Sequence, residues 1–330
     1  MSRLRVTLAC EAYDRTIPLL TGAVRAAGID INYLPMQVEE TFHRMVKFGE
    51  FDVSELSLSS YVLTLQRDDP PFIAIPVFPS RSFRHGGIYV NTAAGIAGPG
   101  DLVGRRVGIP EYQVTAAVWI RGMLADRYGV PVASVTYKTG GLHAPGRVEK
   151  EPIRLPPDVD VTPIADDQTL VEMLVSGEID ALYSPRTPQP FRDGDPRVGR
   201  LFEDLPATEA EYFRQTRIFP VMHVVALRRD VYDRNRWMAR SLFDAFEEAR
   251  RLTMNAIDET AALRYMLPWL QSEVERTRTV MGADYWRYGV SPDDPTLATF
   301  LRYSHDQGLA HRLWSPDEIF AKETLDAVIV

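Results

Sequence analysis

The chain has 330 residues, of which 45% are hydrophobic and 25% are charged, and its formal net charge at pH 7 is -8. This composition is typical of a globular protein, and the length is enough for roughly two domains. The acidic balance argues against a nucleic-acid partner, and no apolar run approaches the roughly 20 residues that span a membrane. A few buried arginines can still bind a small anion, so an anionic ligand is not excluded.

The N-terminal segment alternates polar and apolar side chains from Arg3 to Cys10 and lacks the long apolar core of an export signal. We therefore expect a first strand here and a protein that stays in the cytoplasm. Cys10 is the only cysteine, so no intrachain disulfide can form. Its position at the end of an apolar run favours a packed thiol over a nucleophile.

The first part of the chain alternates strand and helix patterns. Apolar runs predict strands at residues 4–9, 29–34, 51–56 and 87–91. Helical spacing predicts helices at residues 17–27 and 41–48, which end at glycines, and a third helix from Ser57. Strands that alternate with helices indicate a mainly parallel sheet.

A second set of elements follows a glycine-rich turn. The pattern predicts a strand at 106–110, a helix from Val114 to Tyr128, a proline-rich surface loop at 142–163, and a helix capped by Asp167 that ends at Gly177. One more strand is expected at 224–227. Helices follow from Asp233, and we expect this block to cover the first lobe.

Two nine-residue segments, 45–53 and 173–181, resemble each other. Each contains a helix end, a Gly-Glu turn and the start of a strand. Such junctions are common, so chance similarity is the alternative. We interpret them as equivalent units of two similar sheets, with ligand-binding loops beyond the strand ends at residues 55–60 and 184–186.

These units, with chain crossings near Tyr89 and His223, predict the fold class. It is an α/β, two-lobed fold like that of type II periplasmic binding proteins, with a hinged interlobe cleft. Lobe 1 would contain residues 1–90 and 222–330, and lobe 2 would contain residues 91–221.

The first candidate site segment is the loop at 78–85, where Arg81, Arg84 and His85 stand beside aromatic residues. A guanidinium matches a carboxylate in shape and charge, and histidine can transfer a proton near neutral pH. A solvated basic turn is the alternative. Arg186 follows a strand end and is a further candidate for a carboxylate, or else an ordinary surface arginine.

A third segment lies at the predicted start of a helix and contains Glu111, Tyr112, Gln113 and Thr115. The free backbone N–H groups of a helix N-terminus can hold an anion. In the alternative interpretation, Glu111 and Thr115 only cap the helix and complement its dipole.

The six histidines show neither the H-x-H nor the H-E-x-x-H spacing of a metal site. We therefore predict no metal site, although a divalent metal held by distant residues such as Glu55, His85 and His223 stays open. The sequence contains no phosphate-binding glycine motif and no signature of nucleophilic catalysis.

Several motifs along the whole chain are specific in combination: Tyr13-Asp14-Arg15-Thr16, residues 51–61, 67–72 and 75–81, Phe83-Arg84-His85, Pro110-Glu111-Tyr112-Gln113, residues 219–223 and Tyr303-Ser304-His305. Together they resemble the 4,5-dihydroxyphthalate decarboxylase family. The resemblance implies the fold of periplasmic solute-binding proteins. It also implies loss of CO2 from 4,5-dihydroxyphthalate to give protocatechuate, or decarboxylation of a related hydroxylated aromatic acid, without an organic cofactor.

In that reaction, a ring oxygen para to the carboxylate pushes electrons onto the carboxyl-bearing carbon, which takes a proton before CO2 leaves. The site then needs cations for the second carboxylate and acid–base groups near the ring. The candidates are Arg81, Arg84 and Arg186 for the carboxylate, His85 and His223 for proton transfer, Glu55 for a catechol hydroxyl, Ser57 and Tyr112 for ring orientation, and Glu111, Gln113 and Thr115 as further substrate contacts.

The predicted partner is thus a small aromatic carboxylate, and a homo-oligomer stays open. The competing function is a non-catalytic solute-binding protein for the same kind of ligand, because the fold alone does not distinguish the two. A biosynthetic enzyme on the same scaffold would need a reactive nucleophile, and Cys10 is a poor candidate.

Overall fold

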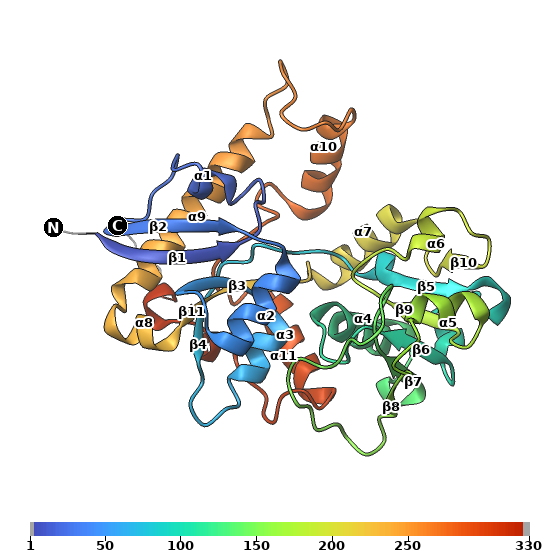
Figure 1. The fold of residues 1–330 in the computed structure, drawn as a ribbon. Helices are drawn as coiled ribbons and strands as arrows, with labels where there is room; N and C mark the ends of the chain where they lie inside the picture. Colours follow the sequence, from blue (N-terminus) through green and yellow to red (C-terminus); the bar gives the residue numbers. More distant parts are fainter. Residues whose placement is uncertain (1–2, 326–330) are drawn as a thin grey trace. The chain divides into compact units, whose positions relative to one another are not determined.

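The computed structural model describes residues 3–325 and contains two sheets, one in each of two compact units (Figure 1). Unit 1 comprises the described residues within 1–81, 213–295 and 314–330, and unit 2 comprises 82–212 and 296–313. Val53 and Ala181, which belong to the two similar segments, lie in different sheets as predicted. The predicted α/β class with two separate sheets is confirmed.

The sheet of unit 1 has five strands: β1 (Leu4–Cys10), β2 (Ile29–Pro35), β3 (Val53–Ser57), β4 (Phe72–Ile75) and β11 (His223–Arg228). Their order is β2-β1-β3-β11-β4. β1 is parallel to β2 and β3, whereas β11 is antiparallel to β3 and β4. β11, which comes from late in the sequence, therefore lies between β3 and β4. This position places the side chains of β11 next to those of β3.

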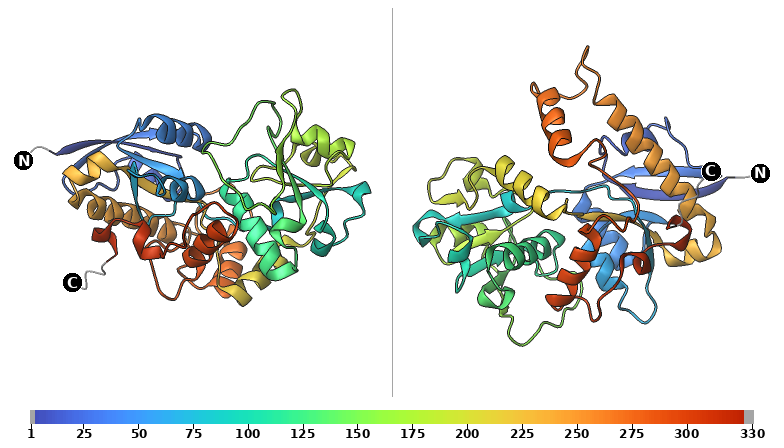
Figure 2. Two further views of the ribbon diagram at one scale, coloured as in Figure 1. Left: turned by 90° about the horizontal axis from the view of Figure 1, so that it is seen from below. Right: turned by 180° about the vertical axis from the view of Figure 1, so that it is seen from behind.

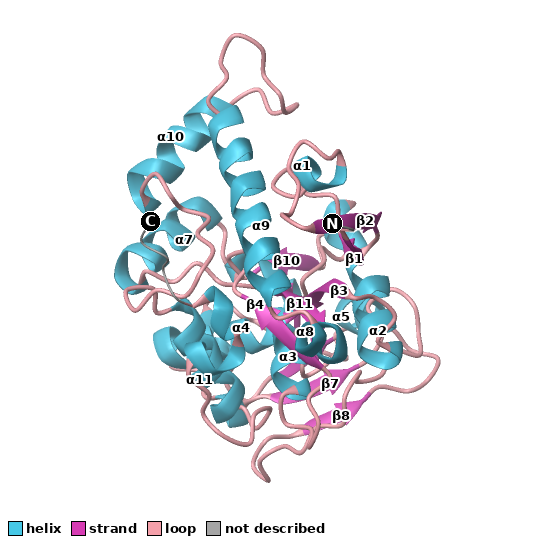
Figure 3. Cartoon of the chain, turned by 90° about the vertical axis from the view of Figure 1, so that its left-hand side faces the viewer, coloured by secondary structure: helices cyan, strands magenta, loops and turns pink. Residues whose placement is uncertain are grey.

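Helices cover both faces of this sheet: α1 (Ile17–Leu20), α2 (Val38–Phe48), α3 (Leu58–Thr64), α8 (Arg229–Arg234) and α9 (Trp237–Ala256). Helix α10 (Leu270–Met281) also belongs to unit 1. The long helix α9 packs Met238, Leu242 and Phe246 against strand residues such as Val6 and Leu8. It runs along the sheet in Figures 2 and 3. Helices α2 and α3 pack on the opposite face (Figure 1).

The first predicted helix is wrong in length. The sequence predicted residues 17–27, but α1 ends at Leu20 because Gly22 turns the chain with a φ of 74°. The end of α2 agrees with the prediction, since Gly49 adopts the left-handed conformation that favours glycine and closes the helix with an N–H···O bond to Met45.

The sheet of unit 2 has six strands: β5 (Ile88–Asn91), β6 (Arg106–Ile109), β7 (Thr136–Thr139), β8 (Val161–Pro163), β9 (Ala181–Tyr183) and β10 (Val198–Arg200). Their order is β10-β5-β9-β6-β7-β8. The four strands β6 to β9 pair in parallel, and β5 is antiparallel to β9 and β10. The predicted mainly parallel arrangement therefore holds for the four strands β9-β6-β7-β8, which reach one edge of this sheet.

Helices of unit 2 are α4 (Thr115–Tyr128), α5 (Leu170–Ser176), α6 (Gln189–Arg192), the start of α7 (Leu205–Thr216), and α11 (Thr296–Asp306). Helix α5 packs Leu170 and Leu174 against Leu182 of the sheet. Its N-cap is Thr169 rather than the predicted Asp167, because the helix begins later and the Thr169 hydroxyl accepts the Glu172 N–H.

Helix α11 packs in unit 2 against α4. Gly122 leaves the space that the ring of Tyr303 fills, and Trp119 contacts Phe300 and Tyr303 with ring-centroid distances of 5.4 and 5.6 Å. The packing thus assigns residues 296–313 to unit 2, whereas the division drawn from the sequence placed them with the other C-terminal helices. An apolar helix face predicts burial but does not show which sheet it covers.

Candidate active site

Glu55, in the middle of β3, and His223, at the start of β11, form a pair on neighbouring strands of unit 1. In the antiparallel register of β3 and β11, His223 lies opposite Ser57, and Glu55 lies opposite Val225. Glu55 and His223 are therefore diagonal neighbours on one face of the sheet. The Nδ1 atom of His223 lies 2.6 Å from Oε1 of Glu55. The sequence named both residues, and the structure brings them together.

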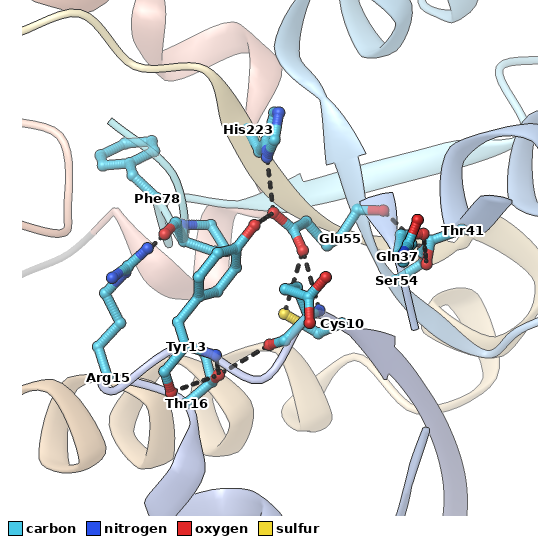
Figure 4. A network of polar contacts seen from close by, with 12 residues as sticks. Cys10, Tyr13, Arg15, Thr16, Gln37, Thr41, Ser54, Glu55, Phe78 and His223 are labelled. Carbon is cyan, nitrogen blue, oxygen red and sulfur yellow. Dashed lines mark hydrogen bonds and ion pairs between the residues drawn. The ribbon is translucent and has the colours of Figure 1, made fainter. Parts of the chain in front are cut away.

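Glu55 is fully buried and accepts contacts from four groups (Figure 4). Besides His223, these are the hydroxyl of Tyr13 at 2.8 Å, the backbone N–H of Glu11 at 3.1 Å and the thiol of Cys10 at 3.5 Å. Burial favours the protonated carboxyl, but the bond to His223, the charge of His223 and the bonds from Glu11 and Tyr13 outweigh it and hold the pKa of Glu55 below its ordinary value. Glu55 is therefore a buried carboxylate anion.

His223 presents only one of its two ring nitrogens to Glu55. Its ring meets Phe42 edge to face with a centroid distance of 4.8 Å, and 16% of its side chain is exposed. With Nδ1 bound to the carboxylate, Nε2 is the nitrogen that can exchange a proton with a ligand. This arrangement fits a general acid or base whose orientation is fixed by a buried charge.

Tyr13 is a site residue that was not among the candidates named from the sequence. It lies just after β1, and its sequence signal was the Tyr13-Asp14-Arg15-Thr16 motif. Cys10 agrees with the packed-thiol interpretation, because burial and the charge of Glu55 raise the pKa of its thiol well above the ordinary value. The thiol is therefore a donor to Glu55 and a poor nucleophile.

Arg81 is buried in unit 1 and does not point to solvent. Its Nη1 donates to the carbonyl of Phe219 at 3.0 Å, and its Nη2 donates to the carbonyl of Arg287 at 2.8 Å. Asp294 lies 3.9 Å away, and burial lowers the pKa of Arg81 to about 10. These contacts tie three chain segments together, which is a structural use of the guanidinium.

His85 lies in unit 2, in the 3-10 turn His85–Gly87, and is fully buried. The rings of Tyr128, Phe202 and Tyr212 surround it at centroid distances of 6.1, 5.1 and 5.1 Å. Neither ring nitrogen has a hydrogen-bond partner among the described residues, and burial lowers the pKa of His85 to about 4. Its neighbour Arg84 is also in unit 2, where burial lowers the pKa of the guanidinium to about 10.

The predicted anion site at the start of α4 already holds a carboxylate of the chain. Oε1 of Glu149 accepts the backbone N–H of Tyr112 at 2.5 Å, and its Oε2 accepts the side-chain amide of Gln113 at 2.8 Å. Glu111 pairs with Arg147 and Lys150, each at 2.7 Å. The sequence could not show that the loop at 142–163 supplies these partners.

The other candidates have local roles in the structure. The ring of Tyr112 is fully buried, and its hydroxyl donates to the carbonyl of Gln307 at 3.2 Å; Thr115 is buried in the first turn of α4. Ser57 caps α3 by accepting the N–H of Ser60, and Arg186 is exposed on unit 2. The predicted convergence of Arg81, Arg84 and Arg186 joins residues of different units, and it stays a prediction.

Residues 3–325 contain no group of three or more His, Cys, Asp or Glu side chains that could hold a metal ion. Within the same residues, no helix is long and apolar enough to cross a membrane.

Two known proteins are similar in sequence to this chain. It is 36% identical over 327 residues to the 4,5-dihydroxyphthalate decarboxylase of Comamonas testosteroni, which covers 99% of each chain. It is 41% identical over 214 residues to the 4,5-dihydroxyphthalate decarboxylase of Pseudomonas putida, which covers 65% of this chain and 83% of that protein. No family model matches the chain.

Solved structures share the fold at low sequence identity. The periplasmic aliphatic sulphonate binding protein of Escherichia coli has a TM-score of 0.53 at 12% identity, covering 98% of this chain and 99% of that one. A desulfurization enzyme has a TM-score of 0.50 at 14% identity, covering 97% and 96%. At these identities the likeness shows the fold alone, which is that of the periplasmic binding proteins, as predicted.

Proposed function

The chain belongs to the 4,5-dihydroxyphthalate decarboxylase family, and we propose that it converts 4,5-dihydroxyphthalate to protocatechuate and CO2 with His223 as the proton donor. The activity is that of a carbon–carbon lyase. The observation that carries the role of His223 is its bond to the buried, charged Glu55, which orients the ring and leaves Nε2 for the substrate.

Loss of an aryl carboxylate needs a proton at the ring carbon that bears it. The hydroxyl para to that carboxylate pushes electrons toward this carbon, and the imidazolium of His223 transfers its Nε2 proton to it. The bond between the ring and the carboxylate then breaks, its electrons restore the aromatic ring, and CO2 leaves. One proton is consumed for each CO2, and neutral His223 takes a new one from solvent.

Glu55 acts in this proposal through His223 and not on the substrate. An ionised carboxylate has about four acceptor sites, and Glu55 already has four donors while its side chain is fully buried. The expected bond from a catechol hydroxyl would have to displace one of them. A charged Glu55 instead stabilises the imidazolium and fixes the ring, as a buried carboxylate does for other catalytic histidines.

His85 is not assigned a proton-transfer role in this proposal. Enclosure by three aromatic rings and a pKa of about 4 keep it neutral near pH 7 and separate its nitrogens from solvent. A neutral, enclosed imidazole cannot supply a proton to a ring carbon.

We propose that the reaction needs no organic cofactor, that it takes place in the cytoplasm, and that it serves the degradation of phthalates. A small aromatic carboxylate is the partner. Turnover with and without a chelator tests the metal, and cell fractionation tests the location.

The test is turnover of 4,5-dihydroxyphthalate by the purified protein, with CO2 and protocatechuate both measured. We expect His223→Gln to lower kcat by about 10²–10⁴-fold, the range of general acid–base groups, with a much smaller change in substrate affinity. His43→Gln, on the exposed side of α2, is the matched control and should leave kcat unchanged.

Two outcomes would overturn the proposal. Tight binding of 4,5-dihydroxyphthalate by the wild type without CO2 release would favour a solute-binding protein. Full turnover in a folded His223→Gln variant would remove this histidine from the mechanism.

A further inference from the structure

Arg15 lies beside the Glu55–His223 pair and has no role in the mechanism above. It belongs to the loop between β1 and α1, which is closed by the hydroxyl of Thr16. That hydroxyl accepts the N–H of Tyr13 at 2.9 Å and donates to the carbonyl of Glu11 at 2.9 Å. The loop that carries Arg15 is therefore fixed to the end of the strand that leads to Cys10.

The guanidinium of Arg15 is held between two aromatic rings. Its Cζ lies 4.2 Å from the ring centroid of Tyr13 and 4.3 Å from that of Trp286. Its Nε donates to the carbonyl of Pro79 at 2.6 Å, and its Nη1 donates to Asp14 at 2.8 Å. A long, flexible side chain is thus fixed before any ligand arrives, which lowers the entropy lost on binding.

Most of the donors of this guanidinium are still available. An arginine has five N–H donors, and the contacts with Pro79 and Asp14 use two of them. Nη2 makes no hydrogen bond to any described residue, and 16% of the side chain is exposed. Nη1 is also ion-paired with Asp14, so a ligand carboxylate would bind Nη2 together with the second N–H of Nη1.

Arg15 is joined to the proton donor through a single side chain. The ring of Tyr13 lies under the guanidinium, and its hydroxyl donates to Oε1 of Glu55, the same oxygen that holds His223 (Figure 4). Arg15 is thus connected to His223 through Tyr13 and Glu55. Arg81 is less suited to this role, because only 3% of its side chain is exposed and it is held by the carbonyls of Phe219 and Arg287.

We propose that Arg15 binds the carboxylate that stays on the ring during decarboxylation, and so selects aromatic acids with two adjacent carboxylates. This inference rests on the proposed function. A cation on the departing carboxylate would hold the negative charge that must move into the ring, and it would slow the reaction. A cation on the neighbouring carboxylate orients the substrate without slowing the loss of CO2. The product keeps this second carboxylate.

The test separates carboxylate binding from catalysis by using two ligands that do not react. Phthalate carries both carboxylates and no hydroxyls, whereas catechol carries two hydroxyls and no carboxylate. We would measure the Kd of each by calorimetry with wild type, Arg15→Gln, Arg15→Lys and the exposed control Arg25→Gln. Thermal unfolding of each variant accompanies the titrations.

We expect Arg15→Gln to raise the Kd of phthalate by about 10–100-fold, which is the loss of a charge-assisted bidentate contact, and to leave the Kd of catechol unchanged. The phthalate Kd of Arg15→Lys should lie between those of wild type and Arg15→Gln, because lysine keeps the positive charge but lacks the planar fork of N–H donors. Arg25→Gln should change neither Kd.

Equal weakening of both ligands in Arg15→Gln would overturn the inference, because it would mean that Arg15 only supports Tyr13 and Trp286. An unchanged phthalate Kd, or no phthalate binding by the wild type, would overturn it as well. A selective phthalate effect in a protein that releases no CO2 would support Arg15 as the carboxylate site while rejecting the proposed reaction.

Discussion

The Nδ1 atom of His223 lies 2.6 Å from Oε1 of Glu55, although the two residues are 168 positions apart in the chain. The antiparallel pairing of β11 with β3 produces this contact, because it places His223 opposite Ser57 and turns both side chains to the same face as Glu55. Each of the two residues depends on its partners for its role in the site. Glu55 stays charged in a buried position because four donors surround it, and His223 is oriented because that charge is fixed.

Glu55→Gln tests this dependence directly. The amide has one acceptor oxygen and would turn two N–H donors toward groups that are themselves donors. We expect kcat for 4,5-dihydroxyphthalate to fall by about 10²–10⁴-fold while KM changes little, because the acid loses its orientation and its counter-charge. The surface variant Glu40→Gln serves as the control. Retention of most of the wild-type kcat in Glu55→Gln would show that His223 works without the carboxylate.

Tyr13→Phe removes one of the four donors to Glu55 and keeps the ring under Arg15. We expect the free energy of unfolding at pH 7 to fall by about 1–2 kcal/mol, measured by urea denaturation, because a buried carboxylate loses a hydrogen bond. Glu55 has a lowered pKa in the folded state, so its stabilisation is present above its unfolded pKa and is lost as the pH falls through the folded value.

Without the Tyr13 hydroxyl, the pKa of Glu55 in the folded protein is lowered less. The acid unfolding midpoint of Tyr13→Phe should therefore move to higher pH than that of the wild type. An unchanged midpoint together with unchanged stability would mean that the Tyr13 hydroxyl contributes nothing to holding the charge on Glu55.

The sequence predicted the fold well where local patterns decide it. The two Gly-Glu junctions marked equivalent helix–strand units in separate sheets, since Gly49 and Gly177 both end helices in the left-handed conformation. The site was predicted in part. Glu55 and His223 were named for their chemistry and then paired by strand register, which a residue pattern does not contain.

Other parts of the site depend on contacts that the sequence does not show. His85 is enclosed by rings from three separate segments of the chain. The sequence suggested a proton-transfer role for His85, but this enclosure favours a neutral, buried side chain. Arg81 appeared to be a ligand-binding loop residue, but backbone carbonyls from distant segments take its donors. Arg15 was visible only as part of a motif, because its significance depends on Trp286 and on the position of Tyr13.

Gly122→Ala tests the packing of α11 in unit 2. A Cβ atom at Gly122 would overlap the ring of Tyr303, whose hydroxyl also donates to Asp126 at 2.7 Å. We expect the free energy of unfolding to fall by about 1–3 kcal/mol, the usual effect of overpacking. Gly100→Ala is the matched control, since nothing lies within 4 Å of the added Cβ. Equal stability of the two variants would contradict the close contact of α4 with α11.

The last prediction concerns Glu209, which lies on α7 with Oε1 at 3.9 Å from Nδ1 of His85. Burial raises the pKa of Glu209 to about 7, against the opposing effects of the Gly86 N–H, Arg200 and Arg84. Between its unfolded pKa near 4.5 and this folded value, the folded protein binds more protons at Glu209 than the unfolded chain does. Stability from this group therefore falls as the pH rises through that window.

Glu209→Gln removes the titration and keeps the shape of the side chain. The stability of the variant relative to wild type should rise between pH 5 and pH 7 and then level off, measured by urea denaturation at each pH. His85, whose pKa is lowered by burial to about 4, gives the opposite slope between about pH 4 and pH 6.5, but it is present in both proteins and cancels in the difference. A difference that stays constant from pH 5 to pH 8 would show that Glu209 is as well solvated in the folded protein as in the unfolded chain.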